Sequence, residues 1–412
     1  MRQTHLWREA SVEVDGETTV CVTIEAPNQE RSQLWYRLPT QYSSLITPSC
    51  DPFVVATILL FMRWSAPVVV HGQVSPSLLQ NLEEFQAAWV CWHPSWYQKI
   101  EITAEVEREI AEVALSDEAI TTFSGGVDSC FTAWRHRTAH CGRQQRNLQA
   151  AVMVHGFDIP LEQQQAFDSA VAKSREMLSS LGVALIPVAT NFRELAQDWE
   201  DAHGAGIASC LMLLQRGYKT GLIASGPSYK SLVLPQGSNP ITDSFLSSNA
   251  FQIIHDGAGF SRLEKIKEIA QWPEALQNLR VCWEGSQLDR NCGQCEKCIR
   301  TILSFRAWGM SLPPCFEQDV TDRQIRDIRV KKAQLEVDFV PILKLAKAMT
   351  LSDSWVSNLE KCIADNQRWY VREERKASLR EALEKREAWL KKHLPPRVRS
   401  QLGKLRSRLS PK

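Results

Sequence analysis

The sequence has little of what marks membrane, secreted or strongly charged proteins. Its apolar run at residues 52–62 has 11 residues, whereas a membrane-spanning helix needs about 20. The first 17 residues lack the apolar core of a signal peptide, so we expect a cytoplasmic protein without a transmembrane segment. Lysine and arginine total 48 against 47 for aspartate and glutamate, and the net charge of +1 neither favours nor excludes a nucleic-acid partner.

The composition is that of a folded globular protein. Hydrophobic residues make up 44% and charged residues 23% of the 412, which excludes a disordered chain, a collagen-like fibre and a coiled-coil rod. This length suffices for two or three domains. We expect the 12 cysteines to be thiols rather than disulfides because no secretion signal is recognised, and a tight cluster of them would indicate a metal site.

Composition divides the chain into three regions, 1–115, 116–310 and 311–412. The first is predicted to be a mixed α/β domain, and its residues assign it no chemistry. Its expected elements are strands at 11–14, 19–25 and 67–71 and helices over 53–64 and 78–88. The last region is predicted to be helical. Its end, residues 388–412, holds eight basic and no acidic residues and could bind nucleic acid or an anionic membrane, or stay solvated.

The middle region alternates strand and helix patterns. The expected strands are 119–123, 150–154, 183–188 and 221–224, and the expected helices are 130–136, 161–181 and 207–216. Such alternation predicts an α/β fold with a doubly wound, mostly parallel sheet. Right-handed crossovers would bring the carboxyl end of every strand, with the loop that follows it, to one edge of the sheet.

A glycine-containing loop, Ser124-Gly-Gly-Val-Asp-Ser129, lies between the first of these strands and a helix. Gly125 and Gly126 let the backbone approach a ligand closely, and the N–H groups from Gly126 through Val127 to Ser129 would lie at the positive end of the helix dipole. With the hydroxyls of Ser124 and Ser129, they would form a cradle for phosphate. Asp128 beside an anion suggests a bound Mg²⁺ between them. The alternative is a plain Gly-Gly turn flanked by serines.

No Gly-Lys-Ser/Thr follows this loop, so it is not the P-loop of kinases. SGGVDS after a strand instead resembles the signature of the PP-loop ATP pyrophosphatase superfamily. The resemblance implies the HUP-like α/β fold of that superfamily, with the β- and γ-phosphates of ATP in the loop. It also implies attack of a substrate oxygen on the α-phosphorus, which releases pyrophosphate and leaves an adenylated substrate.

Four cysteines follow with the spacing of a metal site: Cys282, Cys292, Cys295 and Cys298. Two Cys-x-x-Cys steps in series let three thiolates meet at one ion, and Cys282 is near enough to complete a tetrahedron. Four protein ligands leave no open position, so we expect a structural Zn²⁺. An iron–sulfur cluster uses similar ligands and is the competing interpretation, and four unrelated buried thiols are the plainest one.

Together, the loop and the segment CGQCEKCIR indicate a more specific resemblance within the PP-loop superfamily. They resemble the 7-cyano-7-deazaguanine synthase family of queuosine-type biosynthesis, and the resemblance covers the middle region only. It implies that ATP adenylates the carboxylate of a deazapurine, that ammonia displaces AMP to give an amide, and that a second activation gives the nitrile. In that family the cysteines hold a structural zinc beside the active site.

The resemblance also suggests further site residues. The turn after the second strand, His155-Gly156-Phe157, lies where the superfamily contacts adenosine, although a polar turn explains it as well. Asp243 corresponds in position to the family's deazapurine-binding aspartate, and the same stretch contains Ser238 and Asn239. His255 is a candidate general acid or base, or else a loop histidine. The candidate catalytic cations at the same edge are Lys230, Arg262 and Lys265.

Other interpretations stay open. The turn at 155–158 departs from the family pattern, and the first region and basic tail have no counterpart, which suggests a relative with a different and possibly macromolecular acceptor. A tRNA-thiolating PP-loop enzyme is the main alternative, with Cys130 and Cys210 as its candidate sulfur carriers. A non-catalytic nucleotide-binding module is another. Nucleic acid is possible but unsupported, the ammonia donor is unknown, and we expect a homo-oligomer.

Overall fold

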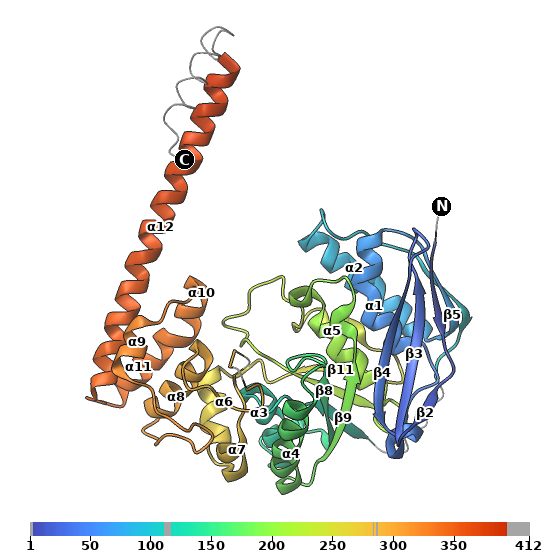
Figure 1. Ribbon diagram of the computed structural model, residues 1–412, viewed down its shortest axis with the longest axis horizontal. Coiled ribbons are helices and arrows are strands. Elements are labelled where there is room, and N and C mark those ends of the chain that lie inside the picture. The colour runs from blue at the N-terminus through green and yellow to red at the C-terminus, as the bar shows by residue number, and fades with distance from the viewer. Residues whose placement is uncertain (1–2, 111–116, 283, 286, 394–412) are drawn as a thin grey trace. The chain divides into compact units, whose positions relative to one another are not determined.

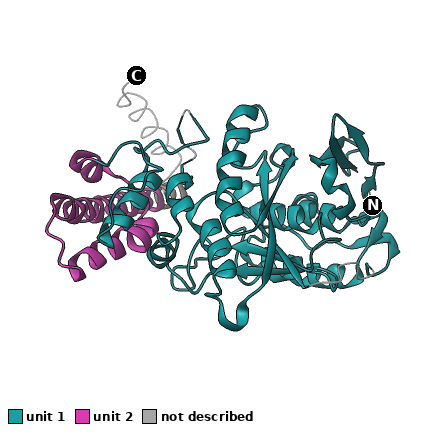
Figure 2. Ribbon diagram, turned by 90° about the horizontal axis from the view of Figure 1, so that it is seen from below, with its two compact units in different colours: residues 1–320 teal, residues 321–412 magenta. Residues whose placement is uncertain are grey.

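An eleven-stranded mixed sheet forms the frame of residues 1–320. Its order is β11-β10-β7-β8-β9-β4-β3-β1-β5-β6, and β2 pairs with β3. In this computed structural model the described residues are 3–110, 117–282, 284–285 and 287–393, with side chains described up to 386. The chain divides into two compact units, Met1–Val320 and Thr321–Lys412, which Figure 2 colours teal and magenta.

The half of the sheet that follows residue 117 is entirely parallel. Its strands are β7 (Glu118–Thr122), β8 (Asn147–His155), β9 (Ala184–Thr190), β10 (Thr220–Ala224) and β11 (Gln252–Asp256). The first four confirm predicted strands. β11 was not predicted, because Gln252 and the pair His255–Asp256 interrupt its apolar run.

The order of these strands creates a crevice at the end of β7. From β7 the chain moves outward to β8 and β9, then crosses back to β10 and β11 on the other side of β7. In such doubly wound sheets, ligands bind at the carboxyl ends of the strands where the direction reverses. Thr122 ends β7 at this point, and the loop Ser124–Ser129 follows it.

Helices cover both faces of this half, as a doubly wound sheet requires. The crossover helices are α3 (Val127–Arg137), α4 (Gln164–Ser180) and α5 (Trp199–Met212). Right-handed crossovers put α3 and α4 on one face and α5 on the other, because the direction of winding reverses between them. The buried residues of α4 recur with helical spacing and are Phe167, Ala170, Val171, Ser174, Met177 and Leu178.

The first 110 residues extend the same sheet. Their strands are β1 (Thr4–Arg8), β2 (Val12–Val14), β3 (Glu17–Glu25), β4 (Arg31–Pro39), β5 (Val68–Val74) and β6 (Ile102–Glu107). β1, β4 and β6 were not predicted. The predicted helices are confirmed as α1 (Asp51–Trp64) and α2 (Pro76–Trp92). The apolar run at 52–62 is buried throughout, and α1 packs against α5 (Figure 1).

One antiparallel contact joins the two halves of the sheet. β4 pairs with β9 through Tyr36 opposite Thr190 and Arg37 opposite Ala189. Asn191 extends this ladder with its side chain: its Oδ1 accepts the N–H of Trp35 at 3.0 Å, and its Nδ2 donates to the carbonyl of Gln33 at 2.9 Å. The first and middle regions therefore share one sheet and one hydrophobic core. The expected boundary at 115/116 lies outside the described residues.

Three further helices complete unit 1, and the rest form unit 2. Those of unit 1 are α6 (Arg262–Ile269), α7 (Pro273–Asn278) and α8 (Glu296–Ala307). Those of unit 2 are α9 (Asp322–Asp327), α10 (Lys332–Gln334), the π-helical turn η5 (Leu335–Phe339), α11 (Val340–Ala348) and α12 (Ser354–His393). The short 3₁₀ turns are η1 (Thr40–Leu45), η2 (Gly142–Gln144), η3 (Phe192–Glu194) and η4 (Asp243–Leu246). The predicted helical C-terminal region is thus confirmed as far as residue 393, whereas 394–412 of the basic tail lies outside the described residues.

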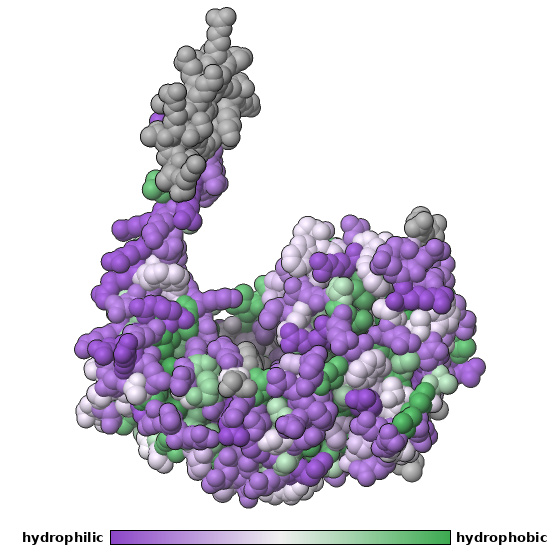
Figure 3. Space-filling view, viewed as in Figure 1, coloured by the Kyte–Doolittle hydropathy of each residue, from purple (hydrophilic) through white to green (hydrophobic). Residues whose placement is uncertain are grey.

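Of the helices within the described residues, none combines the length and the apolar character needed to cross a bilayer. On the face drawn in Figure 3, hydrophobic residues lie scattered among hydrophilic ones, without one broad apolar patch among the described residues.

We expect Asn191→Ala to lower the free energy of unfolding by about 1–3 kcal/mol, because it removes two part-buried hydrogen bonds between this side chain and the backbone of β4. Asn249→Ala is the control, since Asn249 is exposed outside the helices and strands, and it should change stability by less than about 0.5 kcal/mol. Urea unfolding of both variants measures the difference. Equal stabilities would contradict the role assigned to the β4–β9 junction.

Candidate functional site

A cavity of about 730 Å³ opens at the carboxyl ends of β7, β8 and β10. Its lining combines the predicted loop with residues from β8, the start of α5 and the segment before α8. The lining residues are Thr122, Phe123, Ser124, Asp128, Ser129, Val152, Met153, Val154, Phe157, Asp158, Ile159, Arg193, Trp199, Glu200, His203, Ile207, Ile223, Ala224, Gly226, Gln236, Ser238, Arg280 and Lys297. The cavity therefore lies where the strand order predicts a ligand-binding crevice.

The loop has the local structure of an anion cradle. Gly125 has φ of +75°, which a residue with a Cβ rarely adopts, whereas Gly126 is extended and is the N-cap of α3. The Ser129 hydroxyl donates to the carbonyl of Gly126 at 3.1 Å, and the Ser124 hydroxyl accepts the N–H of Gly126 at 3.3 Å. Val127 is buried and anchors the start of α3. The first N–H groups of α3 lack acceptors within the helix, so this end suits an anion.

Asp128 is held by two of the predicted cations. Lys265 Nζ donates to its Oδ1 at 2.8 Å, and Arg262 Nη1 lies 3.5 Å from its Oδ2. Burial alone would raise the pKa of Asp128, but Lys265 and Arg262 outweigh it and the pKa is lowered. Asp128 is therefore a carboxylate at neutral pH. The third predicted cation, Lys230, is exposed and is not among the described residues that line the cavity.

Lys265 itself is almost completely buried, with 1% of its surface exposed. Besides Asp128, its ammonium group donates to the carbonyl of Ser225, which follows β10. α6 begins with a capping box between Ser261 and Glu264, which fixes where the helix starts and so which side chain it turns inward. The Ser124–Ser129 loop, the end of β10 and α6 thus meet at one ammonium group.

Arg280 also binds the loop, although no motif in the sequence marks it as a site residue. Its guanidinium donates to the carbonyl of Ser124 from Nη2 at 3.0 Å, and its backbone N–H donates to the carbonyl of Gly125 at 2.8 Å. Nη2 also lies 3.6 Å from Asp158. Lys297, between two of the predicted metal ligands, lines the same cavity, and burial lowers its pKa to about 8.

The predicted turn after β8 contributes to the cavity mainly through Phe157. His155 is buried; its Nε2 donates to the carbonyl of Pro160 at 2.9 Å, and its ring stacks on Phe167 at 4.3 Å between centroids. Gly156 has φ of +97°, and a Cβ there would lie 2.1 Å from the carbonyl oxygen of Thr190. His155 and Gly156 therefore shape the turn that presents Phe157 to the cavity.

The predicted acceptor residues form a hydrogen-bonded chain. Asp243 is fully buried; its Oδ2 accepts from the hydroxyl of Ser238 at 2.8 Å and from Nδ1 of His255 at 2.8 Å. Ser238 lines the cavity, and Asp243 and His255 lie behind it. The side chain of His255 is 3% exposed, and its Nε2 has no hydrogen-bond partner among the described residues. The side chain of Asn239 binds Gln236 and residues 241–242 of its own turn, and its backbone N–H donates to Oδ1 of Asp243 at 3.1 Å.

Residues in and just before α5 also line the cavity, and of these Trp199 and Arg193 were not predicted. Trp199 packs edge-on against Phe157, and the guanidinium of Arg193 lies 4.6 Å from the Trp199 ring centroid. His203 lies one turn later, and its Nδ1 donates to the carbonyl of Glu200 at 3.0 Å. Their position after β9, at the edge where the other strand-end loops meet, is the signal that could have identified them.

The four predicted metal ligands come together. Their sulfur atoms all lie within 4.8 Å of one another, with Cys292–Cys298 and Cys282–Cys295 separations of 3.8 and 3.7 Å. A tetrahedral Zn²⁺ with bonds of about 2.3 Å requires sulfur–sulfur separations of about 3.8 Å, whereas a disulfide would need about 2.05 Å. The residues therefore fit a four-coordinate metal such as zinc.

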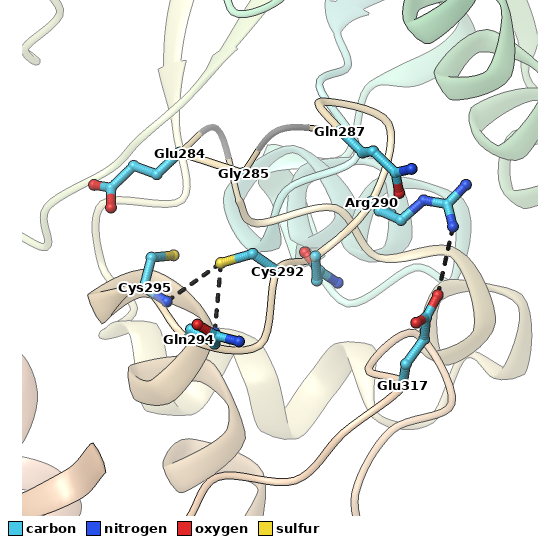
Figure 4. A pocket seen from close by; sticks show the side chains of 9 residues that line it. Glu284, Gly285, Gln287, Arg290, Cys292, Gln294, Cys295 and Glu317 are labelled. Atoms are coloured by element: carbon cyan, nitrogen blue, oxygen red, sulfur yellow. Dashed lines mark hydrogen bonds and ion pairs between the residues drawn. The ribbon is translucent and has the colours of Figure 1, made fainter.

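The backbone around these cysteines has the form of a metal-binding turn. Gly293 has φ of +70°, which turns the chain so that the N–H groups of Gln294 and Cys295 point at the Cys292 sulfur, at 3.4 and 3.3 Å (Figure 4). A hydrogen bond from the Cys298 thiol, partly offset by burial, lowers the pKa of Cys295 to about 5. A thiolate is the form that binds zinc.

Comparison with known proteins adds no assignment. The chain matches no family model, no curated protein and no solved structure.

We expect Cys295→Ser to abolish stoichiometric zinc binding and to lower stability, because a structural metal contributes directly to folding free energy. Cys91→Ser is the matched control, since Cys91 is exposed and outside the cluster. Zinc content by elemental analysis and the thermal unfolding midpoint measure both effects. One zinc per chain in Cys295→Ser would overturn the assignment, and iron in the wild type would favour a cluster.

Proposed function

We propose that this protein is an ATP-dependent enzyme of the PP-loop type, which adenylates a carboxylate and releases pyrophosphate. The observation that carries the proposal is the location of the Ser124–Ser129 loop. The loop follows β7, at the point where the direction of winding of the sheet reverses. Ser124, Asp128 and Ser129 of the loop line a cavity together with further polar and aromatic residues. A plain Gly-Gly turn would have no reason to lie at this point.

The charges around the loop suit a triphosphate. Arg280 and Lys297 line the cavity, and Arg262 and Lys265 approach it through Asp128. Cations arranged in advance stabilise charge that develops on phosphate oxygens during transfer, without reorganising at the moment of reaction. The Asp128 carboxylate, 28% exposed, is the candidate ligand for the Mg²⁺ that would accompany ATP.

Other residues that line the cavity suit a small aromatic acceptor. Trp199 and Phe157 offer apolar ring surfaces, and Ser238 offers a hydroxyl held by Asp243. A deazapurine carboxylate, the acceptor of the 7-cyano-7-deazaguanine synthase family, combines a flat ring with polar edges. We propose it, or a related carboxylate, as the substrate. Asp243 and His255 would then act on the acceptor through Ser238 rather than by contact.

The proposed chemistry requires the protein mainly to orient and stabilise. A carboxylate is a poor electrophile; adenylation turns one of its oxygens into part of a good leaving group. Ammonia then attacks the acyl carbon, AMP departs, and an amide remains; a second activation would give a nitrile. Holding both reactants in one cavity makes these steps effectively intramolecular. The zinc held by the four cysteines would have a structural part and take no step.

The thiolation alternative has less support. Cys130 and Cys210 are buried, and neither is among the described residues that line the cavity. Burial raises the pKa of both thiols, that of Cys210 to about 12, whereas a sulfur carrier needs an accessible thiolate.

The direct test is release of AMP and pyrophosphate from Mg·ATP, with and without 7-carboxy-7-deazaguanine and ammonium. We expect turnover that depends on both. ATP turnover that is indifferent to the deazapurine would keep the nucleotide site and reject this acceptor. Absence of any nucleotide binding would reject the enzyme class and favour a protein without a nucleotide site.

Asp128→Asn tests the proposed metal ligand. The amide keeps the size of the side chain but removes the charge, so we expect turnover to fall by about 100-fold or more, as for loss of an electrostatic catalytic group. It also leaves the ammonium of Lys265 without its carboxylate, so stability is measured in parallel. Asp168→Asn, an exposed carboxylate on α4, is the control and should keep full activity. Normal turnover by a folded Asp128→Asn would reject the Mg²⁺ assignment.

A further inference from the structure

The segment that contains Cys282, one of the four predicted metal ligands, also forms hydrogen bonds with the Ser124–Ser129 loop. Cys282 belongs to the cluster, and Arg280 lies two residues before it. Arg280 holds the loop from its backbone, at the carbonyl of Gly125, and from its side chain, at the carbonyl of Ser124. Its side chain is nearly buried, with the residue 8% exposed, and Nη1 donates to Leu288 at 3.2 Å.

A second connection runs through the other side of the cluster. Lys297 lies between Cys295 and Cys298 at the start of α8, and its side chain lines the cavity. Two cavity-lining cations, Arg280 and Lys297, therefore lie within two residues of a metal ligand, on two different stretches of the chain. Moving Cys282 or Cys295 by even about an ångström would move Arg280 or Lys297 with it.

One contact between these stretches does not depend on a metal. Asn291, next to Cys292, accepts the N–H of Val281 at 2.9 Å and donates to the carbonyls of Leu279 and Cys315. This side chain keeps the two stretches together when no ion binds the cysteines. Loss of the metal is therefore expected to loosen Arg280 rather than to release it.

We propose that metal binding at the four cysteines and nucleotide binding at the phosphate loop are thermodynamically coupled through Arg280. The proposal rests on the proposed function, because it takes the loop to be the nucleotide site. When the metal holds Cys282, the carbonyls of Ser124 and Gly125 are fixed and the loop is organised in advance for phosphate. Without it, a nucleotide must order both the segment and the loop, and its affinity falls.

Such coupling is reciprocal. If the metal strengthens nucleotide binding by a given factor, the nucleotide must strengthen metal binding by the same factor. A metal with only a local folding role would stabilise the protein without this reciprocity. Because Asn291 keeps the two stretches together without a metal, we expect the metal to strengthen nucleotide binding by a factor of only about ten. This factor lies within the range usual for coupled sites.

The experiment compares the full-length protein with and without zinc. The dissociation constant of Mg·α,β-methylene-ATP is measured by calorimetry, and the affinity for zinc is measured by competition with a chromogenic chelator, with and without the nucleotide analogue. We expect zinc removal to weaken nucleotide binding about tenfold, and the analogue to strengthen zinc binding by the same factor. Equal nucleotide affinities with and without zinc would overturn the coupling.

Two variants test whether Arg280 transmits the coupling between the metal site and the nucleotide site. Arg280→Gln should retain zinc and bind the analogue about tenfold more weakly, and zinc removal should then weaken binding little further. Arg290→Gln removes the same charge near the cluster, but its exposed guanidinium pairs with Asp289 and, as Figure 4 shows, with Glu317, so it should behave as the wild type. Because Arg280 also lines the cavity, its loss can weaken nucleotide binding directly. The deciding comparison is therefore the response of the zinc affinity to the analogue, which should be lost in Arg280→Gln and kept in Arg290→Gln.

The outcomes separate this coupling from the proposed function. Zinc-loaded wild type that binds no analogue would overturn both the nucleotide site and the coupling. Zinc-loaded wild type that binds it, with unchanged affinity in Arg280→Gln, would overturn the coupling through Arg280 and leave the proposed function standing.

Discussion

The candidate site depends on one buried positive charge. The ammonium of Lys265 is removed from water, and an uncompensated charge there would cost several kcal/mol. Asp128 and the carbonyl of Ser225 compensate it, so the Ser124–Ser129 loop and the end of β10 both lie against the same residue of α6. Arg280 holds the other side of the loop through the carbonyls of Ser124 and Gly125. The shape of the cavity follows from these two attachments.

The parallel half of the fold could be predicted because its signals are local. β7, β8, β9 and β10 are short apolar runs between turn residues, and the helices between them have helical spacing. β11 could not, because the partners of its polar residues lie far away in the sequence: Asp256 accepts from Thr132 and His136. The continuity of the sheet was equally hidden, since it rests on a short β4–β9 ladder and on Asn191.

The same distinction applies to the site. The loop Ser124–Ser129 and the four cysteines are compact motifs whose spacing encodes their geometry. Arg280 and Trp199 reach the cavity only through the tertiary fold, and no local pattern marks them. Among the residues suggested by resemblance, Ser238 and Phe157 line the cavity, Asp243 and His255 lie behind it, and Lys230 lies outside it. A family resemblance can suggest a residue, but burial decides whether it can touch a ligand.

We propose that one cavity receives a triphosphate at the Ser124–Ser129 loop beside a metal-loaded four-cysteine site. A crystal structure of the zinc-loaded protein with Mg·α,β-methylene-ATP tests it most directly, with anomalous scattering at the zinc edge locating the metal. We expect triphosphate density beside the Ser124–Ser129 loop and the start of α3. We also expect one anomalous peak about 2.3 Å from each of the four sulfur atoms. A nucleotide bound elsewhere, or a disulfide in place of the metal, would contradict it.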